Sequence, residues 1–188
     1  LLLAFLAVPL AWGALVAEEA WVIAAVRDGW TSSYYSWDAA VPAGRGAGIA
    51  DGRLRVGGWG DEYRSLLKFD LTGQPPVAAQ VRLRLWCFSS GDTRARGGTP
   101  MRLEAVTGPW GSVRKLWWEE QPAGFGVGRV WPAARPGMWY AIEVTALYNA
   151  WQSGALANHG LRLSPLLTDN RFNEFRSADY QADPEKRP

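Results

Sequence analysis

Apolar and polar residues alternate repeatedly from Arg53 onward, with the period of two that is typical of half-buried β-strands. Residues 81–86 alternate most regularly, with Leu83 and Leu85 on one face of the expected strand. The same pattern predicts six further strands, at residues 53–56, 64–71, 101–106, 139–144, 159–163 and 173–177. Glycine- and proline-rich turns separate these segments. Short strands without long helices between them predict an antiparallel, all-β sandwich.

One segment departs from this pattern. Residues 145–153 space Leu147, Tyr148 and Trp151 at helical intervals. Thr145 is a suitable N-cap and Gly154 a suitable C-terminal stop, so the segment predicts one short helix between two strands.

The first 17 residues form an uncharged, apolar run that ends in small residues, and charge begins at Glu18. This pattern is typical of the apolar region of a secretory signal, and we expect cleavage after Ala17. An uncleaved anchor and a buried core helix are the alternatives, although Pro9 interrupts the run and its length is short for a membrane span. We therefore expect a secreted or cell-surface protein whose folded domain covers residues 18–188, with membrane contact only through an uncleaved segment.

Composition narrows the range of functions. The 188 residues suffice for one domain, and the net charge of +2, without runs of like charge, gives no indication of nucleic-acid binding. The single cysteine, Cys87, cannot form an internal disulfide and alternates with leucines as a buried residue does. The single histidine, His159, has no serine or cysteine at a spacing that indicates a catalytic triad. Glu119 and Glu120 are adjacent, so on a strand they would point to opposite faces and could not act on one glycosidic bond. The domain alone is therefore not expected to be an enzyme.

No cofactor is predicted. A structural calcium ion remains an alternative, but the candidate aspartates are too scattered for a recognised calcium loop. They are Asp28, Asp38, Asp61, Asp70 and Asp92.

The order of several short motifs is more specific than any one of them. They read GRLRVG at 52–57, YRSLLKFDL at 63–71, WWEEQPA at 117–123, EVT at 143–145, WQSG at 151–154, NHGLRL at 158–163 and FRSADY at 175–180. Across residues 21–188 the chain thereby resembles the DNRLRE domain family. The resemblance implies an exported jelly-roll β-sandwich, similar to carbohydrate-binding modules for alginate and acidic glycans.

This resemblance has consequences for both fold and partners. Family members close with one more strand after the proline, whereas this chain stops at Pro188, so we expect a missing final strand and an unfilled position at one sheet edge. The implied partner is a polysaccharide, with neighbouring modules in a longer chain. The alternatives are a structural or adhesive surface module and an accessory domain of a polysaccharide lyase or hydrolase.

The chain contains 12 tryptophans, which either fill a core or present a flat face for stacking. Trp12 belongs to the signal-like run. We expect Trp110, Trp118 and Trp151 to be structural, because they lie at a corner, in a turn and on the apolar side of the expected helix.

The first candidate binding site is the segment 29–38, which places aromatic rings among small polar residues, as binding loops do. Its rings are Trp30, Tyr34, Tyr35 and Trp37. The alternative is that this segment folds back and buries its own rings.

The second candidate lies on the strand at residues 81–86, where Trp86 shares a face with Arg82 and Arg84. Guanidinium groups beside an indole suit a uronic acid, whose carboxylate accepts paired hydrogen bonds while its ring stacks. The alternative is a basic outer face that only prevents aggregation. Trp59 and Tyr63, which flank a turn, are further candidates for the rim of a site.

Overall fold

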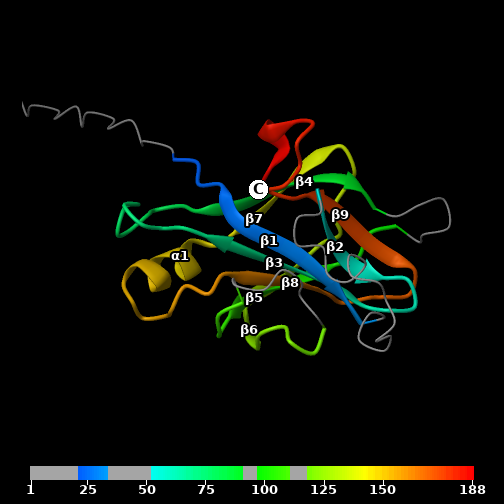
Figure 1. Cartoon of the computed structure of the whole chain (residues 1–188), viewed down its shortest axis with the longest axis horizontal. Coiled ribbons are helices and arrows are strands. Elements are labelled where there is room, and N and C mark those ends of the chain that lie inside the picture. The colour runs from blue at the N-terminus through cyan, green and yellow to red at the C-terminus, as the bar shows by residue number, and fades with distance from the viewer. Residues whose placement is uncertain (1–20, 34–51, 91–96, 111–117) are drawn as a thin grey trace, which may run out of the picture.

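The computed structural model describes residues 21–33, 52–90, 97–110 and 118–188 (Figure 1). Nine strands occur in this part of the chain: β1 (Ala25–Ser32), β2 (Arg53–Gly58), β3 (Tyr63–Phe69), β4 (Arg82–Ser89), β5 (Met101–Val106), β6 (Gly124–Trp131), β7 (Met138–Glu143), β8 (Leu161–Pro165) and β9 (Arg171–Arg176). The helix α1 (Thr145–Gln152) joins β7 to β8, and the short 3-10 helix η2 (Pro184–Lys186) lies near the end of the chain.

The strands form one curled antiparallel sheet in the order β6-β5-β8-β3-β2-β9-β4-β7, and β1 pairs with β3. The curl occurs between β2 and β3, which pair only at Gly57 and Tyr63. One half of the sheet, β1-β3-β8-β5-β6, therefore faces the other half, β2-β9-β4-β7. The all-β, antiparallel, sandwich-like fold with one short helix is confirmed.

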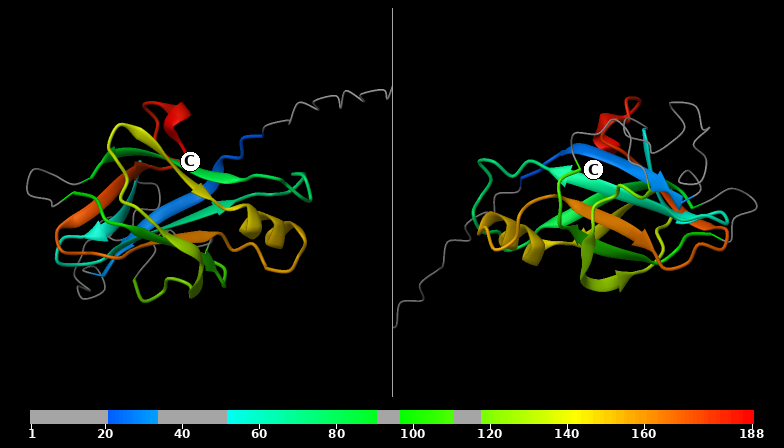
Figure 2. Two further views of the ribbon diagram at one scale, coloured as in Figure 1. Left: turned by 180° about the vertical axis from the view of Figure 1, so that it is seen from behind. Right: turned by 60° about the horizontal axis from the view of Figure 1, so that its bottom comes forward.

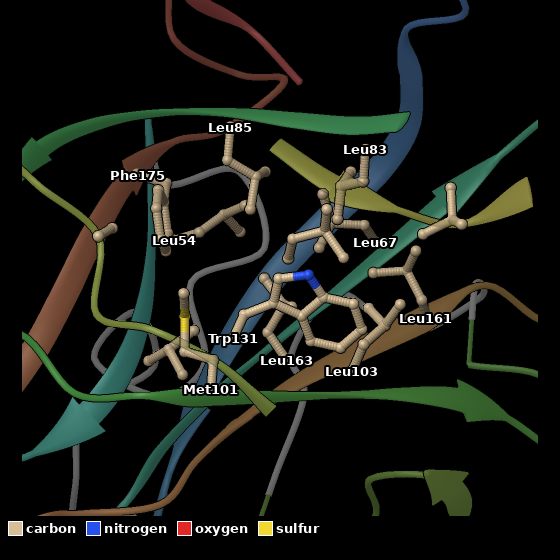
Figure 3. Packing of buried hydrophobic residues seen from close by; sticks show 14 of the residues in the cluster. Leu54, Leu67, Leu83, Leu85, Met101, Leu103, Trp131, Leu161, Leu163 and Phe175 are labelled. Atoms are coloured by element: carbon tan, nitrogen blue, oxygen red, sulfur yellow. The ribbon is translucent and has the colours of Figure 1, made fainter. Parts of the chain in front are cut away.

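The core lies between the two halves of the sheet. Figure 3 shows leucines of β4 directed toward leucines of β3, β5 and β8, with the Trp131 indole in the centre. Phe175 of β9 and Leu54 of β2 are completely buried. Burial follows the alternation of the sequence, since Leu83, Leu85 and Cys87 of β4 point inward between exposed arginines.

The close approach of strands requires glycine at one position in particular. Gly57 has a φ of +146°, and a Cβ there would lie 2.1 Å from a backbone carbonyl oxygen of β9. Because no other residue fits this space and backbone conformation, Gly57 permits β2 to pack closely against β9.

Seven predicted strands are present, with ends shifted by up to three residues, whereas β1 and β6 were not predicted. Strand β1 reads AVRDGWTS and buries Asp28, Thr31 and Ser32, so it lacks the alternation of a half-buried strand. Strand β6 reads GFGVGRVW, in which glycine occupies every second position at first. Both strands are held by pairing with neighbours, β1 with β3 and β6 with β5, which sequence patterns do not reveal.

The predicted helix is also present, but the predicted N-cap is wrong. Thr145 is the first helical residue, and no side chain caps the helix. The Thr145 hydroxyl oxygen instead accepts a hydrogen bond from the Val81 N–H at 2.7 Å. Thr145 therefore ties the start of α1 to the start of β4, whereas Gly154 ends the helix with a φ of +75° as expected.

Two of the tryptophans expected to be structural have clear partners. The Trp110 side chain is buried, and its indole N–H donates to the His159 carbonyl oxygen at 2.7 Å. Trp118 is half-buried beneath the Arg64 guanidinium, whose Cζ lies 4.5 Å from the ring centroid. The Gln121 side-chain amide donates to the Trp118 carbonyl oxygen at 2.9 Å and so closes the turn after Trp118.

The last residues of the chain fold back over the β4–β7 side of the sandwich, as the views in Figures 1 and 2 show. The Ala178 N–H donates to the Asp28 carboxylate at 2.7 Å, and the Ala25 N–H donates to the Pro188 carbonyl oxygen at 3.2 Å. These bonds attach the C-terminal segment to β1. Within the described ranges, no helix is sufficiently long and apolar to cross a membrane.

Candidate functional site

The outer face of β4 and β7 carries a compact group of aromatic and basic side chains. The strands pair so that Trp86 lies opposite Trp139, Arg84 opposite Ala141 and Arg82 opposite Glu143. Since the intervening residues of β4 point into the core, this register places the arginines and both indoles on one surface. Sequence analysis predicted the shared face of Arg82, Arg84 and Trp86, and the burial pattern of β4 confirms it.

The two indoles meet edge to face, with ring centroids 5.6 Å apart and planes inclined by 78°. The Arg84 Cζ lies 4.4 Å from the Trp139 ring centroid, and the Lys186 Nζ lies 4.9 Å from that of Trp86. Each indole is thus in contact with a cation, a favourable arrangement worth about 0.5–1 kcal/mol per pair at an exposed site. The two indole planes are therefore nearly perpendicular, with a cation against each, and they do not form one flat surface for stacking.

The arginines of this face remain accessible. Arg82 and Arg84 are both exposed, and Arg82 lies 3.9 Å from the Glu143 carboxylate, a contact too long and too exposed to hold it firmly. Arg84 has no carboxylate partner in the described part of the chain. Stacking on Trp139 restrains the Arg84 guanidinium plane while its N–H groups stay available to an acceptor.

Trp139 was not among the predicted site residues. The sequence places it at the start of an expected strand, but nothing in the sequence identifies β4 as the pairing partner of that strand. The missing information is the register between β4 and β7, which sets Trp139 against Trp86.

A second group of predicted residues lies near the turn between β2 and β3. Tyr63 contacts Trp30 and Phe172 edge to face, with centroids 5.7 and 6.2 Å apart, and Trp59 contacts Phe172 at 6.1 Å. The Arg55 Cζ lies 4.9 Å from the Trp30 ring centroid. This group contains one clearly exposed ring, that of Trp59.

Trp30 does not lie in a binding loop. It belongs to β1, and 7% of its surface is exposed, because Arg55 and Tyr63 cover the ring. The expectation that residues 29–38 form a loop is therefore wrong for residues 29–32, which belong to strand β1. The remaining candidates of this segment, Tyr34, Tyr35 and Trp37, lie outside the described residues.

The two groups of candidates are separate. Arg82, Arg84 and Trp86 share the β4–β7 face, whereas Trp30, Trp59 and Tyr63 cluster at β1 and the β2–β3 turn. No ring or cation contact joins the groups in the portion that the structure describes. They cannot be treated as one site.

Most other charged groups have structural partners. Arg162 donates to both oxygens of the Glu104 carboxylate, at 2.8 and 3.1 Å, and to the Pro122 carbonyl oxygen at 3.0 Å. Burial would raise the Glu104 pKa, but hydrogen bonds from Arg162 and Ser164 outweigh it and hold the pKa below its usual value. Although Arg162 alternates with leucines along β8, its side chain is buried.

Of the acidic residues considered for calcium, Asp28, Asp61 and Asp70 are described, and they do not form a shared metal site. Asp61 accepts hydrogen bonds from Ser32 and from the Trp59 N–H, Asp70 accepts one from the Thr72 N–H, and Asp38 and Asp92 lie outside the described ranges. Among the residues that the structure describes, no three His, Cys, Asp or Glu side chains are placed to share a metal ion. Burial raises the pKa of the Cys87 thiol to about 11, so this cysteine is a poor nucleophile.

Comparison with known proteins adds no assignment. A scan against protein-family models finds no family that matches this chain, and a search of curated proteins finds no matching sequence.

Proposed function

We propose that this chain is an exported, non-catalytic carbohydrate-binding module that holds an acidic polysaccharide on the outer face of β4 and β7. The observation that carries the proposal is the contact of Arg84 with Trp139 beside Trp86. It combines, on one exposed surface, an anion-binding group with the apolar faces that sugar rings use for stacking.

The chemistry of the arginines favours an acidic ligand over a neutral one. A guanidinium donates two parallel hydrogen bonds to a carboxylate, and such charge-assisted bonds are stronger than those between neutral groups. Arg82 and Arg84 are two residues apart on one face of β4, so successive uronic acid units along a chain could each meet a cation.

The corner formed by Trp86 and Trp139 limits how much of each sugar can stack. We therefore expect weak binding per domain, with dissociation constants from about millimolar to micromolar, or roughly −4 to −8 kcal/mol. Neighbouring modules in a longer chain would raise the apparent affinity by holding several sites on one polysaccharide. The resemblance to the DNRLRE domain family and the signal-like N-terminal run agree with such a role outside the cell.

A glycan array probed with the isolated domain tests the proposal. We expect binding to polyuronates over neutral polysaccharides, and a loss of binding in Trp86→Ala. Trp37→Ala tests whether the segment after β1 takes part. Binding that ignores both substitutions would contradict the site assignment, and an absence of binding to every glycan would contradict the function.

One observation favours an alternative, a structural or adhesive surface module. The rings of Trp86 and Trp139 are perpendicular and half-buried, and a cation already contacts each of them, as expected if they only stabilise the surface. The glycan array separates the two functions, because a spacer module would bind no glycan while folding normally. The role of accessory domain to a lyase or hydrolase is compatible with the first function and concerns what else the longer protein contains.

A further inference from the structure

A cavity of about 550 Å³ opens at the end of the sandwich that carries α1. Its lining residues come from the connection between β3 and β4, from α1, from the segment 21–23 and from the last residues of the chain. Figure 1 shows where α1 and the end of the chain lie in the fold. The volume falls within the range of about 300–1,000 Å³ that small-molecule sites occupy. The cavity shares Arg82, Arg84 and Trp139 with the proposed glycan surface, whereas Trp86 belongs to that surface and does not line the cavity.

The walls of the cavity are mostly apolar. They include Leu71, Val77, Val81, Val144, Tyr148 and Trp151, which come from the β3–β4 connection, the end of β7 and α1. Val77 is 72% exposed at the edge of the cavity, although it is a large apolar residue. Contact between apolar walls and water is unfavourable. An apolar group that fills the cavity would remove this surface from water and would therefore bind favourably.

The charged side chains that line the cavity are mostly positive. Arg82 and Arg84 of β4 and Arg187 of the C-terminal segment line it, against the single carboxylate of Glu185. Arg187 is held by the segment itself, because its Nε donates to the Tyr180 carbonyl oxygen at 2.7 Å. Arg187 keeps its charge, and the two arginines of β4 add to it, so a ligand would meet a positive end of the cavity.

One residue in the wall of the cavity, Trp151, provides a spectroscopic probe of an occupant. Trp151 lines the cavity and is 9% exposed, and its indole N–H has no hydrogen-bond acceptor among the described residues. The Trp110 indole N–H, in contrast, is bonded to a carbonyl oxygen. Native structures leave few buried donors unpaired, since each costs about 1–3 kcal/mol. Because the Trp151 side chain lines the cavity, its indole N–H signal should respond to a molecule that packs against this wall.

We propose that this cavity binds an amphipathic carboxylate, with its apolar body between the β3–β4 connection and α1 and its acid group at Arg82 and Arg84. The shape supplies an apolar enclosure for the body, and the charge selects an anion at one end. A cation or a neutral molecule of the same length would meet the same walls without the attraction of the arginines.

Isothermal titration with dodecanoate, below the concentration at which it forms micelles, tests the proposal. We expect saturable binding to a single site, at least about tenfold tighter than that of dodecyltrimethylammonium. Val77→Glu places a carboxylate at the edge of the cavity and should weaken dodecanoate binding by about tenfold. Val26→Glu makes the same change at a similarly exposed position outside the cavity and should leave binding unchanged.

The location is checked by the indole N–H signals in a proton–nitrogen NMR spectrum, assigned with Trp→Phe variants. Dodecanoate should shift the Trp151 signal and leave the Trp110 signal in place. Trp86→Ala, which removes a residue of the proposed glycan surface, should leave dodecanoate binding intact, so the two proposals fail separately. An absence of saturable binding, equal binding of the cationic amphiphile, or a Trp151 signal that does not move would each overturn the inference.

Discussion

Replacing Asp28 by asparagine should stabilise the protein at neutral and alkaline pH. Asp28 lies on β1 and is 1% exposed. One carboxylate oxygen accepts a hydrogen bond from the Ala178 N–H, and the other is buried without a partner in the described part of the chain. Burial therefore disfavours the charged form and raises the Asp28 pKa from 3.8 to about 7. Asparagine keeps the acceptor for Ala178 and removes the charge.

The size of the effect follows from the pKa interval. Below pH 3.8 the folded and unfolded states both carry the proton, and above about pH 7 neither does. Between these limits the Asp28 carboxyl is protonated in the folded state and ionised in the unfolded state. The free energy of unfolding therefore falls as pH rises, and above about pH 7 the buried charge lowers it by about 4 kcal/mol in total. The asparagine NH₂ group lacks an acceptor, which costs about 1–3 kcal/mol, so a net gain of about 1–3 kcal/mol is expected at about pH 8.

Urea denaturation of the wild type and Asp28→Asn, followed by tryptophan fluorescence from about pH 4 to pH 8, measures this difference. The variant should be less stable than the wild type by about 1–3 kcal/mol at the acidic end and more stable than the wild type at the alkaline end. Glu119→Gln, at an exposed turn, removes a carboxylate that has no such burial and should show no pH-dependent gain. A gain that is constant with pH, or a variant less stable than the wild type at about pH 8, would refute the reasoning.

Two further predictions concern the fold. Arg162→Met should destabilise the protein by about 3 kcal/mol in the same assay, because it leaves the partly buried Glu104 carboxylate without its cationic partner, whereas Arg102→Met at an exposed position of β5 should change stability by less than about 0.5 kcal/mol. An equal effect of both would show that the buried pair has no special role. Gly57→Ala should prevent folding, as judged by loss of cooperative thermal unfolding, while Gly60→Ala, with a φ of +85° but open space around its Cβ, should cost only about 1 kcal/mol. A cooperatively folded Gly57→Ala protein would contradict the close packing of β2 against β9.

Alternation was sufficient to predict strands that have one face in the core and the other in solvent, and β4 and β5 are the clearest cases. It failed for β1, in which Asp28, Thr31 and Ser32 are buried together with Trp30. Such a strand is covered on both faces by other parts of the protein, so its sequence has no period of two. Long-range pairing, which a single sequence does not display, determines that segment.

The candidate site shows the same division. Placing Arg82, Arg84 and Trp86 on one face required only the local period of β4, and that prediction was correct. Finding Trp139 required the register of β7, and recognising that Trp30 is covered required the position of Arg55 on β2. Local patterns thus identify which side chains share a strand face, while the neighbours of that face come from the tertiary structure.

The central claim is that Arg84 and its neighbours on the β4–β7 face bind an acidic polysaccharide, and affinity for a polyuronate measured with Arg84→Gln tests it most directly. The account predicts that Arg84→Gln weakens polyuronate binding by about tenfold and reduces its dependence on salt, because one charge-assisted contact is lost. Arg102→Gln, an equal loss of charge at an exposed position on β5, should have little effect. Equal weakening by both substitutions would mean that only net charge matters and would contradict a specific site on this face.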